Sequence, residues 1–336
     1  MSPFTDTKRN PVLDIDEGLR TLVKQHADGF CGEMLQEHLD TGGKRLRAKL
    51  TLQLADLFYI APKDAMQWAL AVELLHNATL IHDDVQDGDR TRRNRPTTWA
   101  VHGVAQAINA GDLGLMLPYQ CIENMSISDD VRWRLAQTLS KHSIATVNGQ
   151  SLEMRLLSNR DFTLESYTTA SLGKTGAFFG LPMEGIAHLA NLDKTECQQL
   201  VDLFSQIGLL FQMQDDILDC FGNKGRQQGA DICEGKVSFL VVNHLCLYPE
   251  DKPMFTDILE RPSPVDHDTI EHCIDTFAEH GALSLALQEL SSLEHRICSA
   301  TILSSYPTLQ QLVYKLLDTI MNPIQHLFET PLEMTQ

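Results

Sequence analysis

The stretch Leu80-Ile81-His82-Asp83-Asp84-Val85-Gln86-Asp87 decides how this chain of 336 residues is interpreted. It closes the segment from Ala65 to Val85, where apolar residues recur at three and four positions, the period of an amphipathic helix. At 100° per residue, Asp83 and Asp87 lie about 40° apart on one helix face. The stretch Gln212-Met213-Gln214-Asp215-Asp216-Ile217-Leu218-Asp219 repeats this arrangement after a second apolar segment.

These clusters are named here the first aspartate motif (Asp83, Asp84 and Asp87) and the second aspartate motif (Asp215, Asp216 and Asp219). Like charges one turn apart, near the negative end of a helix dipole, repel one another and require a counter-charge. Carboxylate oxygens are the ligands that Mg²⁺ prefers, and this ion commonly shares its shell with substrate phosphates. One motif alone could equally be a solvated helix end, but two predict a metal-bridged diphosphate site. Calcium is the competing ion, although no twelve-residue calcium loop is present.

Helical periodicity dominates the remaining sequence, and alternating strand patterns are almost absent. The other periodic segments are 19–39, 46–58, 131–157 and 200–218. The breakers between them (61–64, 88–96, 126–130, 221–229 and 261–264) are too short for interdomain linkers. We therefore predict a single all-α domain over residues 1–336, built as a large helical bundle, with a poorly specified tail before about Val12.

The charge balance restricts the partners that we expect. With 27 Lys and Arg against 45 Asp and Glu, the net charge is −18, which disfavours nucleic acid and anionic membrane surfaces. The eight cysteines are scattered without metal-binding spacing, so we expect reduced packing residues. Neither a signal peptide nor an apolar run of membrane-spanning length is recognisable. These features predict a soluble, cytoplasmic protein with no membrane span.

Basic residues gather near the two aspartate motifs. Three positive charges lie in Gly42-Gly43-Lys44-Arg45-Leu46-Arg47, at a helix start where free N–H groups also attract anions. Other basic positions in these surroundings are Arg90, Arg92, Arg93, Arg95, Lys174 and Lys236. Any one of them alone would be interpreted as a solvated charge, and His76 as a core histidine. Their arrangement in an acidic chain instead indicates a local lining for an anion.

Together these residues resemble the trans-isoprenyl diphosphate synthases, also called the polyprenyl synthetase family. The resemblance runs from Gly42 to about Leu240. Its blocks, in order, are GGKRLR (42–47), ELLHNATLIHDDVQDGDRTRRNRPT (73–97), AGD (110–112), GQ (149–150), GKTG (173–176), FQMQDDILDCFG (211–222) and DICEGK (231–236). The resemblance implies a bundle of long, mostly antiparallel helices around a central apolar cavity, and a homodimer.

The resemblance also assigns roles to individual residues. It implies Mg²⁺ ligation by Asp83, Asp87, Asp215 and Asp219, supported by Asp84 and Asp216. The diphosphate of the allylic substrate would be held by Arg92, Lys174, Thr175, Gln212, Arg226 and Lys236. Isopentenyl diphosphate would be held by Lys44, Arg47, His76 and Arg93. The residues that would carry the catalysis are Asp83, Asp84, Asp87, Arg92, Lys174, Asp215 and Lys236.

Five positions depart from the pattern of this family. Ala48 and Leu240 replace common prolines, Asn94 a common glycine and Glu153 a common aspartate. We interpret these four as structural variations. Arg226 lies where many members carry a lysine, and a guanidinium fork is not equivalent to an ammonium point charge.

Product length should depend on the residues of the helix that precede Asp83. In the family, an aromatic residue four or five positions before this aspartate usually stops the product at farnesyl diphosphate. Here Thr79 and Ala78 are small, and Leu75 lies on the next turn. We therefore expect geranylgeranyl diphosphate.

Several alternatives remain open. The product could be farnesyl diphosphate or a longer polyprenyl diphosphate. A class I terpene cyclase on the same fold would keep both aspartate motifs but would not need the residues for isopentenyl diphosphate. A non-catalytic partner subunit of a prenyl synthase is the alternative outside enzymes, but such subunits typically lose an aspartate motif.

Overall fold

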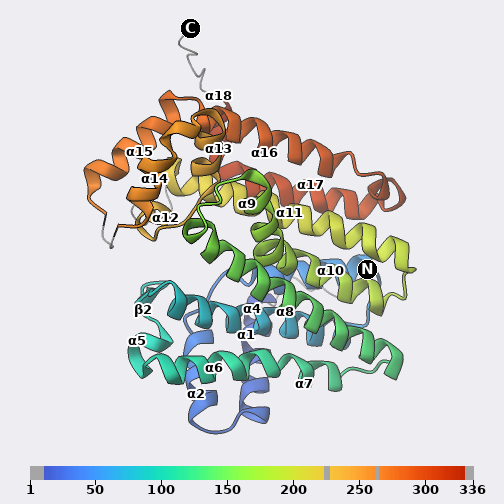
Figure 1. The fold of residues 1–336 in the computed structure, drawn as a ribbon. Helices are drawn as coiled ribbons and strands as arrows, with labels where there is room; N and C mark the ends of the chain where they lie inside the picture. Colours follow the sequence, from blue (N-terminus) through green and yellow to red (C-terminus); the bar gives the residue numbers. More distant parts are fainter. Residues whose placement is uncertain (1–10, 223–227, 262–264, 330–336) are drawn as a thin grey trace. The chain divides into compact units, whose positions relative to one another are not determined.

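The computed structural model describes residues 11–222, 228–261 and 265–329, and this part of the chain is almost entirely helical (Figure 1). The predicted all-α class is therefore confirmed. Backbone contacts divide the chain into two compact units. The first unit comprises residues 1–143 and 180–201, and the second unit comprises residues 144–179 and 202–336. The expectation of one domain over the whole length stays a prediction.

The first unit contains most of the N-terminal helices. Its elements are α1 (Pro11–His26), α2 (Phe30–Leu39), α3 (Leu46–Leu57), α4 (Pro62–Gln86), β1 (Thr91–Arg92), β2 (Arg95–Pro96), α5 (Thr98–His102), α6 (Val104–Met116) and α7 (Pro118–Glu123), with parts of α8 (Asp129–Ser158), α10 (Ala177–Leu189) and α11 (Lys194–Phe221). The periodic segment 19–39 is two helices, because Gly29 has a φ of 103° that interrupts the helical backbone.

Helix α4 lies at the centre of the first unit and packs against α3, α6 and α7. Glycines let α6 approach it closely. A Cβ atom on Gly114 would lie 2.8 Å from the Cβ of Ala78, and one on Gly111 would lie 2.3 Å from Nε2 of His82. The AGD block is thus explained by packing, because Gly111 leaves room for the side chain next to Asp83.

A short β-hairpin with two residues in each strand follows the first aspartate motif. Arg92 pairs with Arg95 in antiparallel register. The two residues of the turn, Arg93 and Asn94, have φ values of 53° and 61°. A turn of this kind requires positive φ at both positions, and asparagine tolerates that conformation better than most residues. The replacement of the common glycine by Asn94 is therefore compatible with the turn.

The second unit holds the C-terminal half. Its elements, beside parts of α8, α10 and α11, are α9 (Leu164–Ser171), the π-helical turn η1 (Leu172–Gly176), α12 (Ala230–Cys233), α13 (Phe239–Leu247), η2 (Pro249–Asp251), α14 (Lys252–Leu259), α15 (His267–Glu279), α16 (Ala282–Cys298), η3 (Thr301–Ser305), α17 (Pro307–Met321), η4 (Asn322–Ile324) and α18 (Gln325–Glu329). Helix α13 packs against α9, α15 and α16. Its residues 239–245 are all buried, which is expected for a helix that is apolar around most of its circumference.

All eight cysteines are free thiols, as predicted. Within the described ranges, no helix combines the length and the apolar character that a membrane crossing needs.

Candidate active site

The first aspartate motif contains carboxylates in two different environments. Asp84 is buried, and Nε of Arg92 donates a hydrogen bond of 2.6 Å to its Oδ1. Burial raises the pKa of Asp84 to about 6, and the charge of Arg92 partly opposes that shift. Asp83 and Asp87 are half-buried, and the N–H of Asp87 caps α4 on the carbonyl of Asp83. Asp84 thus binds Arg92 of the following hairpin, whereas Asp83 and Asp87 are more accessible to water.

The glycine pair before Lys44 makes room for the hairpin. Gly43 has a φ of 141°, and a Cβ atom there would lie 2.8 Å from the guanidinium carbon of Arg93. Nη1 of Arg93 also reaches Oγ1 of Thr41 at 3.4 Å. Lys44 itself is exposed. The fold therefore brings the guanidinium of Arg93 to the start of α3, beside the backbone that carries Lys44.

A second contact joins α3 to α4. Nη1 of Arg47 lies 3.1 Å from Nε2 of His76. Because a guanidinium can only donate, Nε2 must accept, and His76 is the neutral tautomer that carries its proton on Nδ1. Burial, followed by the charges of Arg47 and Arg93, lowers the pKa of His76 well below its usual value. Burial also lowers the pKa of Arg47 to about 10. The structure thus brings together these two predicted site residues.

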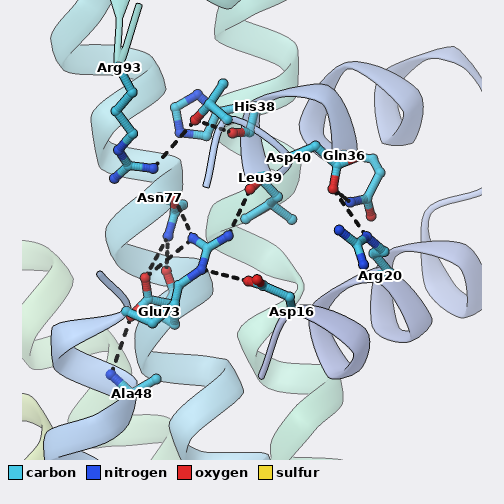
Figure 2. A network of polar contacts seen from close by, with 12 residues as sticks. Asp16, Arg20, Gln36, His38, Leu39, Asp40, Ala48, Glu73, Asn77 and Arg93 are labelled. Atoms are coloured by element: carbon cyan, nitrogen blue, oxygen red, sulfur yellow. Dashed lines mark hydrogen bonds and ion pairs between the residues drawn. The ribbon is translucent and has the colours of Figure 1, made fainter. Parts of the chain in front are cut away.

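Arg45 has a different role from its two basic neighbours. It adopts a left-handed backbone conformation with a φ of 48°, and only 3% of the residue is exposed. Its guanidinium contacts residues of three helices, and these partners are labelled in Figure 2. The partners are Oδ1 of Asp16 at 2.8 Å, the carbonyl of Leu39 at 2.7 Å, Oδ1 of Asn77 at 3.4 Å and Oε1 of Glu73 at 3.5 Å. Grouping Arg45 with Lys44 and Arg47 as an anion-attracting charge was therefore wrong, because its charge is neutralised inside the protein.

Glu73 also explains a departure from the family pattern. The N–H of Ala48, in the first turn of α3, donates to Oε2 of Glu73 at 3.2 Å. Proline at this position would have no N–H to donate. The buried pair of Glu73 and Asn77, one turn apart within an apolar segment, was the sequence signal that could have revealed a buried basic partner.

The second aspartate motif, like the first, has a buried middle residue. Asp216 is buried and accepts three hydrogen bonds of 2.8 Å, from the hydroxyl of Tyr167, Nε2 of Gln212 and the N–H of Phe239. Burial, with the neighbouring Asp231, raises the pKa of Asp216 to about 7, and the three donors oppose this shift. Sequence reasoning missed Tyr167, because it lies in a separate helix and no motif surrounds it.

The other two aspartates of the second motif differ in exposure. Asp215 is half-buried, whereas Asp219 is 3% exposed and accepts the N–H of Asp231 on Oδ2 at 3.1 Å. Helix α12, which carries Asp231, therefore lies beside the motif. Asp83 and Asp87 in the first unit, and Asp215 in the second, are half-buried carboxylates, the type of oxygen ligand that a hard divalent cation such as Mg²⁺ prefers.

The GKTG block forms η1, a π-helical turn of a kind that often occurs at functional sites. Glycines place it against α8, because a Cβ atom on Gly149 would lie 2.3 Å from the backbone nitrogen of Lys174. Lys174 forms an ion pair with Glu153, which therefore keeps the acidic partner that the common aspartate would supply. Oγ1 of Thr175 donates to Oε1 of Gln212 at 2.8 Å, which links η1 to the second aspartate motif.

The remaining predicted residues are partly described. Nζ of Lys236 lies 2.6 Å from Oε2 of Glu234, and its N–H bonds to the carbonyl of Asp231. Arg226 lies outside the described residues. The three positions assigned to product length all lie on α4. Leu75 and Ala78 are buried, Thr79 is half-buried, and Oγ1 of Thr79 donates to the carbonyl of His76.

Comparisons with known proteins agree with these geometric features. Residues 29–277 match the protein family described as Polyprenyl synthetase. The chain is 35% identical over 251 residues to a short chain isoprenyl diphosphate synthase of Methanocaldococcus jannaschii, covering 73% of this chain and 74% of that protein. It is 32% identical to a geranylgeranyl pyrophosphate synthase of Geoglobus acetivorans, covering 68% and 72%.

The fold gives the same result. A crystal structure of a geranylgeranyl pyrophosphate synthase superposes with a TM-score of 0.80 at 26% identity, covering 91% of this chain and 96% of that one. A decaprenyl diphosphate synthase from Rhodobacter capsulatus superposes with a TM-score of 0.81 at 25% identity, covering 93% and 96%. This chain belongs to the polyprenyl synthetase family, and it is an isoprenyl diphosphate synthase, a prenyltransferase.

Proposed function

We propose that this enzyme condenses isopentenyl diphosphate with allylic diphosphates and that its main product is geranylgeranyl diphosphate. The allylic substrates would be dimethylallyl, geranyl and farnesyl diphosphate. The observation that carries the proposal is the basic cluster of the first unit. There Arg47 contacts neutral His76, and Arg93 lies against Gly43, next to Lys44. These groups provide the charge and the hydrogen bonds that a second diphosphate needs.

Mg²⁺ is the cofactor that we propose, with Asp83, Asp87, Asp215 and Asp219 as its ligands. When bound, the ion supplies positive charge where negative charge develops on the leaving diphosphate. The exposure of the first three carboxylates supports this assignment, and Asp84 and Asp216 would support the ligands through Arg92 and Gln212. Calcium stays the competing ion.

The side chains of the protein bind and orient the two substrates. We assign the allylic diphosphate to Arg92, Lys174, Thr175, Gln212 and Lys236, with Arg226 as a further candidate. Breaking the allylic C–O bond leaves a carbocation, and holding the alkene of isopentenyl diphosphate beside it makes C–C bond formation effectively intramolecular. The released diphosphate accepts the proton that the new product loses, so no separate basic side chain is required. Apolar surroundings exclude water that would otherwise capture the cation.

A product assay tests the function directly. The purified chain is incubated with Mg²⁺, isopentenyl diphosphate and each allylic diphosphate in turn, and product masses are measured. We expect geranylgeranyl diphosphate from all three primers. No product from any primer would indicate a non-catalytic subunit, and hydrocarbons formed without isopentenyl diphosphate would indicate a terpene cyclase.

Substitutions in the aspartate motifs test the metal assignment. Asp83→Ala and Asp215→Ala should each reduce kcat by orders of magnitude while the circular dichroism spectrum remains unchanged. Asp129→Ala is the matched control, because this aspartate is fully exposed at the start of α8. Near-normal rates in both motif variants would contradict the assignment.

We further propose a cytoplasmic homodimer. Helix α6 carries three exposed apolar side chains, Val104, Ile108 and Met116, spaced at multiples of four residues. Such an exposed stripe on one helix is typical of a protein–protein contact. A second copy of the chain is the partner that the family resemblance favours.

A further inference from the structure

The second unit contains a cluster of possible metal ligands that shares no residue with the aspartate motifs. His244 lies on α13, Asp251 ends η2, and His280 caps the C-terminus of α15. One ligand atom from each residue lies within 4.8 Å of the others. Within the described ranges, this is the only group of three or more His, Cys, Asp or Glu residues that meets this criterion.

The geometry of this cluster is close to that of a metal site. Nε2 of His244 lies 2.8 Å from Oδ2 of Asp251, and the rings of His244 and His280 have centroids 5.9 Å apart. Ligands of a tetrahedral zinc ion, at bond lengths near 2.1 Å, are about 3.4 Å apart. Small side-chain movements would therefore suffice, because the exposed His280 can turn toward His244 and Asp251.

The surroundings hold the central ligand in place. His244 is fully buried, and its ring contacts Tyr248, Phe255 and Phe277. The backbone at Asp251 is held by a hydrogen bond from its N–H to the carbonyl of Tyr248. A rigid imidazole in an apolar shell, beside a half-buried carboxylate, resembles the protein side of a transition-metal site.

We propose that His244, Asp251 and His280 bind a divalent transition-metal ion, with Zn²⁺ as the ion of first choice. Binding replaces the hydrogen bond between Nε2 of His244 and Oδ2 of Asp251, and neutral His244 then coordinates through Nε2 and carries its single proton on Nδ1. Imidazole nitrogen favours zinc over magnesium, so this site is chemically distinct from the aspartate motifs. Three protein ligands leave a fourth position for water. The bound ion ties α13, η2 and the end of α15 together.

One feature limits the affinity. Nδ1 of His244 is buried and has no hydrogen-bond partner within the described ranges. Metal-bound histidines normally donate this second N–H to an acceptor, and loss of such a partner typically weakens binding 10–100-fold. We therefore expect a moderate affinity, below that of a structural zinc site with a complete outer shell.

Zinc titration of the full-length enzyme tests the proposal. The protein is stripped with a chelator, returned to excess Mg²⁺ without substrate, and titrated against a chromophoric zinc indicator. We expect one equivalent of zinc to bind and to raise the melting temperature. His280→Ala and Asp251→Asn should each weaken this binding at least tenfold. Both positions retain solvent exposure, so these variants are better suited than changes at buried His244.

Two control variants separate this site from other zinc ligands. His272→Ala removes an exposed histidine from α15, the helix that His280 caps. Cys246→Ser removes an exposed thiol from α13, the helix that carries His244. Neither should change the affinity or the stoichiometry. The proposal is overturned if the wild-type chain binds no zinc stoichiometrically, or if His280→Ala and Asp251→Asn bind it as the wild type does. Because no prenyl substrate is present, the result does not depend on the proposed product.

Discussion

Individual carboxylates in this enzyme differ in their burial and in their hydrogen-bond partners. Asp84 and Asp216, the middle residues of the two aspartate motifs, are buried and hydrogen-bonded to protein donors. Their neighbours Asp83 and Asp215 are half-buried. The sequence predicted the motifs but not this division, because one turn of helix offers several faces and only the packing partners decide which face is covered.

Glu184 shows how a buried carboxylate away from the motifs can affect stability. Burial alone would raise its pKa, but hydrogen bonds and charges from His142 and Lys141 outweigh it and lower the pKa to about 2. A depressed carboxylate pKa stabilises the fold above the unfolded value of 4.5, and this contribution is lost as the pH falls toward 2. Glu184→Gln should therefore lose about 3 kcal/mol at pH 7.

Urea unfolding at several pH values measures this effect. The difference in unfolding free energy between wild type and Glu184→Gln should shrink steadily below pH 4.5. The exposed Glu17→Gln on α1 is the control and should show almost no difference at any pH. If the difference in unfolding free energy between wild type and Glu184→Gln stays constant with pH, the stabilisation by Glu184 is not electrostatic.

Product length can be tested at two adjacent residues of α4. Thr79→Phe should shorten the product, because position 79 is half-buried and can accept a larger side chain. Ala78→Phe is a less clean test, since Ala78 is fully buried where Gly114 of α6 approaches it. Overpacking there should cost roughly 1–3 kcal/mol. Product masses and melting temperatures of both variants are compared. An unchanged product from Thr79→Phe would show that position 79 does not limit product length.

At the level of helices, the basic cluster depends on a buried network that holds α3 against α4. Glu73 accepts from Arg45, Asn77 and the N–H of Ala48, so three donors share one carboxylate. The positions of Lys44 and Arg47 on either side of Arg45 follow from that anchor. Breaking a buried ion pair from one side leaves the other charge uncompensated.

We therefore expect Glu73→Ala to destabilise the enzyme by roughly 3–5 kcal/mol. When Arg45→Met is introduced into the Glu73→Ala variant, it should reduce the unfolding free energy much less than it does in the wild type. The guanidinium that Glu73→Ala leaves without a partner is then no longer present. Chemical unfolding of the two single variants and the double variant forms the required cycle. Strictly additive losses would show that Arg45 and Glu73 do not act together.

At the scale of the whole molecule, the exposed stripe on α6 predicts self-association. Ile108→Glu combined with Met116→Glu should convert a dimer to a monomer, because charges would be buried without partners in the contact. Light scattering after size-exclusion chromatography measures the mass. Leu13→Glu, an exposed apolar position on α1, is the control and should leave the mass unchanged. A wild-type chain that is monomeric at assay concentrations would refute the homodimer.

Much of this molecule was predictable from sequence because helical periodicity and short motifs are local properties. The periodic segments 46–58 and 131–157 correspond to α3 and α8 within a few residues. The segment 19–39 forms two helices and not one, because the backbone conformation of Gly29 interrupts the helix that the periodicity predicts. The class of enzyme was also predictable, since GGKRLR, both aspartate motifs and GKTG occur in order along the chain.

Only the tertiary structure decided which charges are available for substrate. From the sequence, Lys44, Arg45 and Arg47 were equivalent positive charges, but folding buries Arg45 against Asp16 and Glu73. Likewise, Tyr167 reaches Asp216 from 49 residues away, and no local pattern indicates that contact. The physical reason is the same in both cases: a side chain's chemistry is set by its sequence, whereas its desolvation and partners are set by helices that meet only in the folded chain.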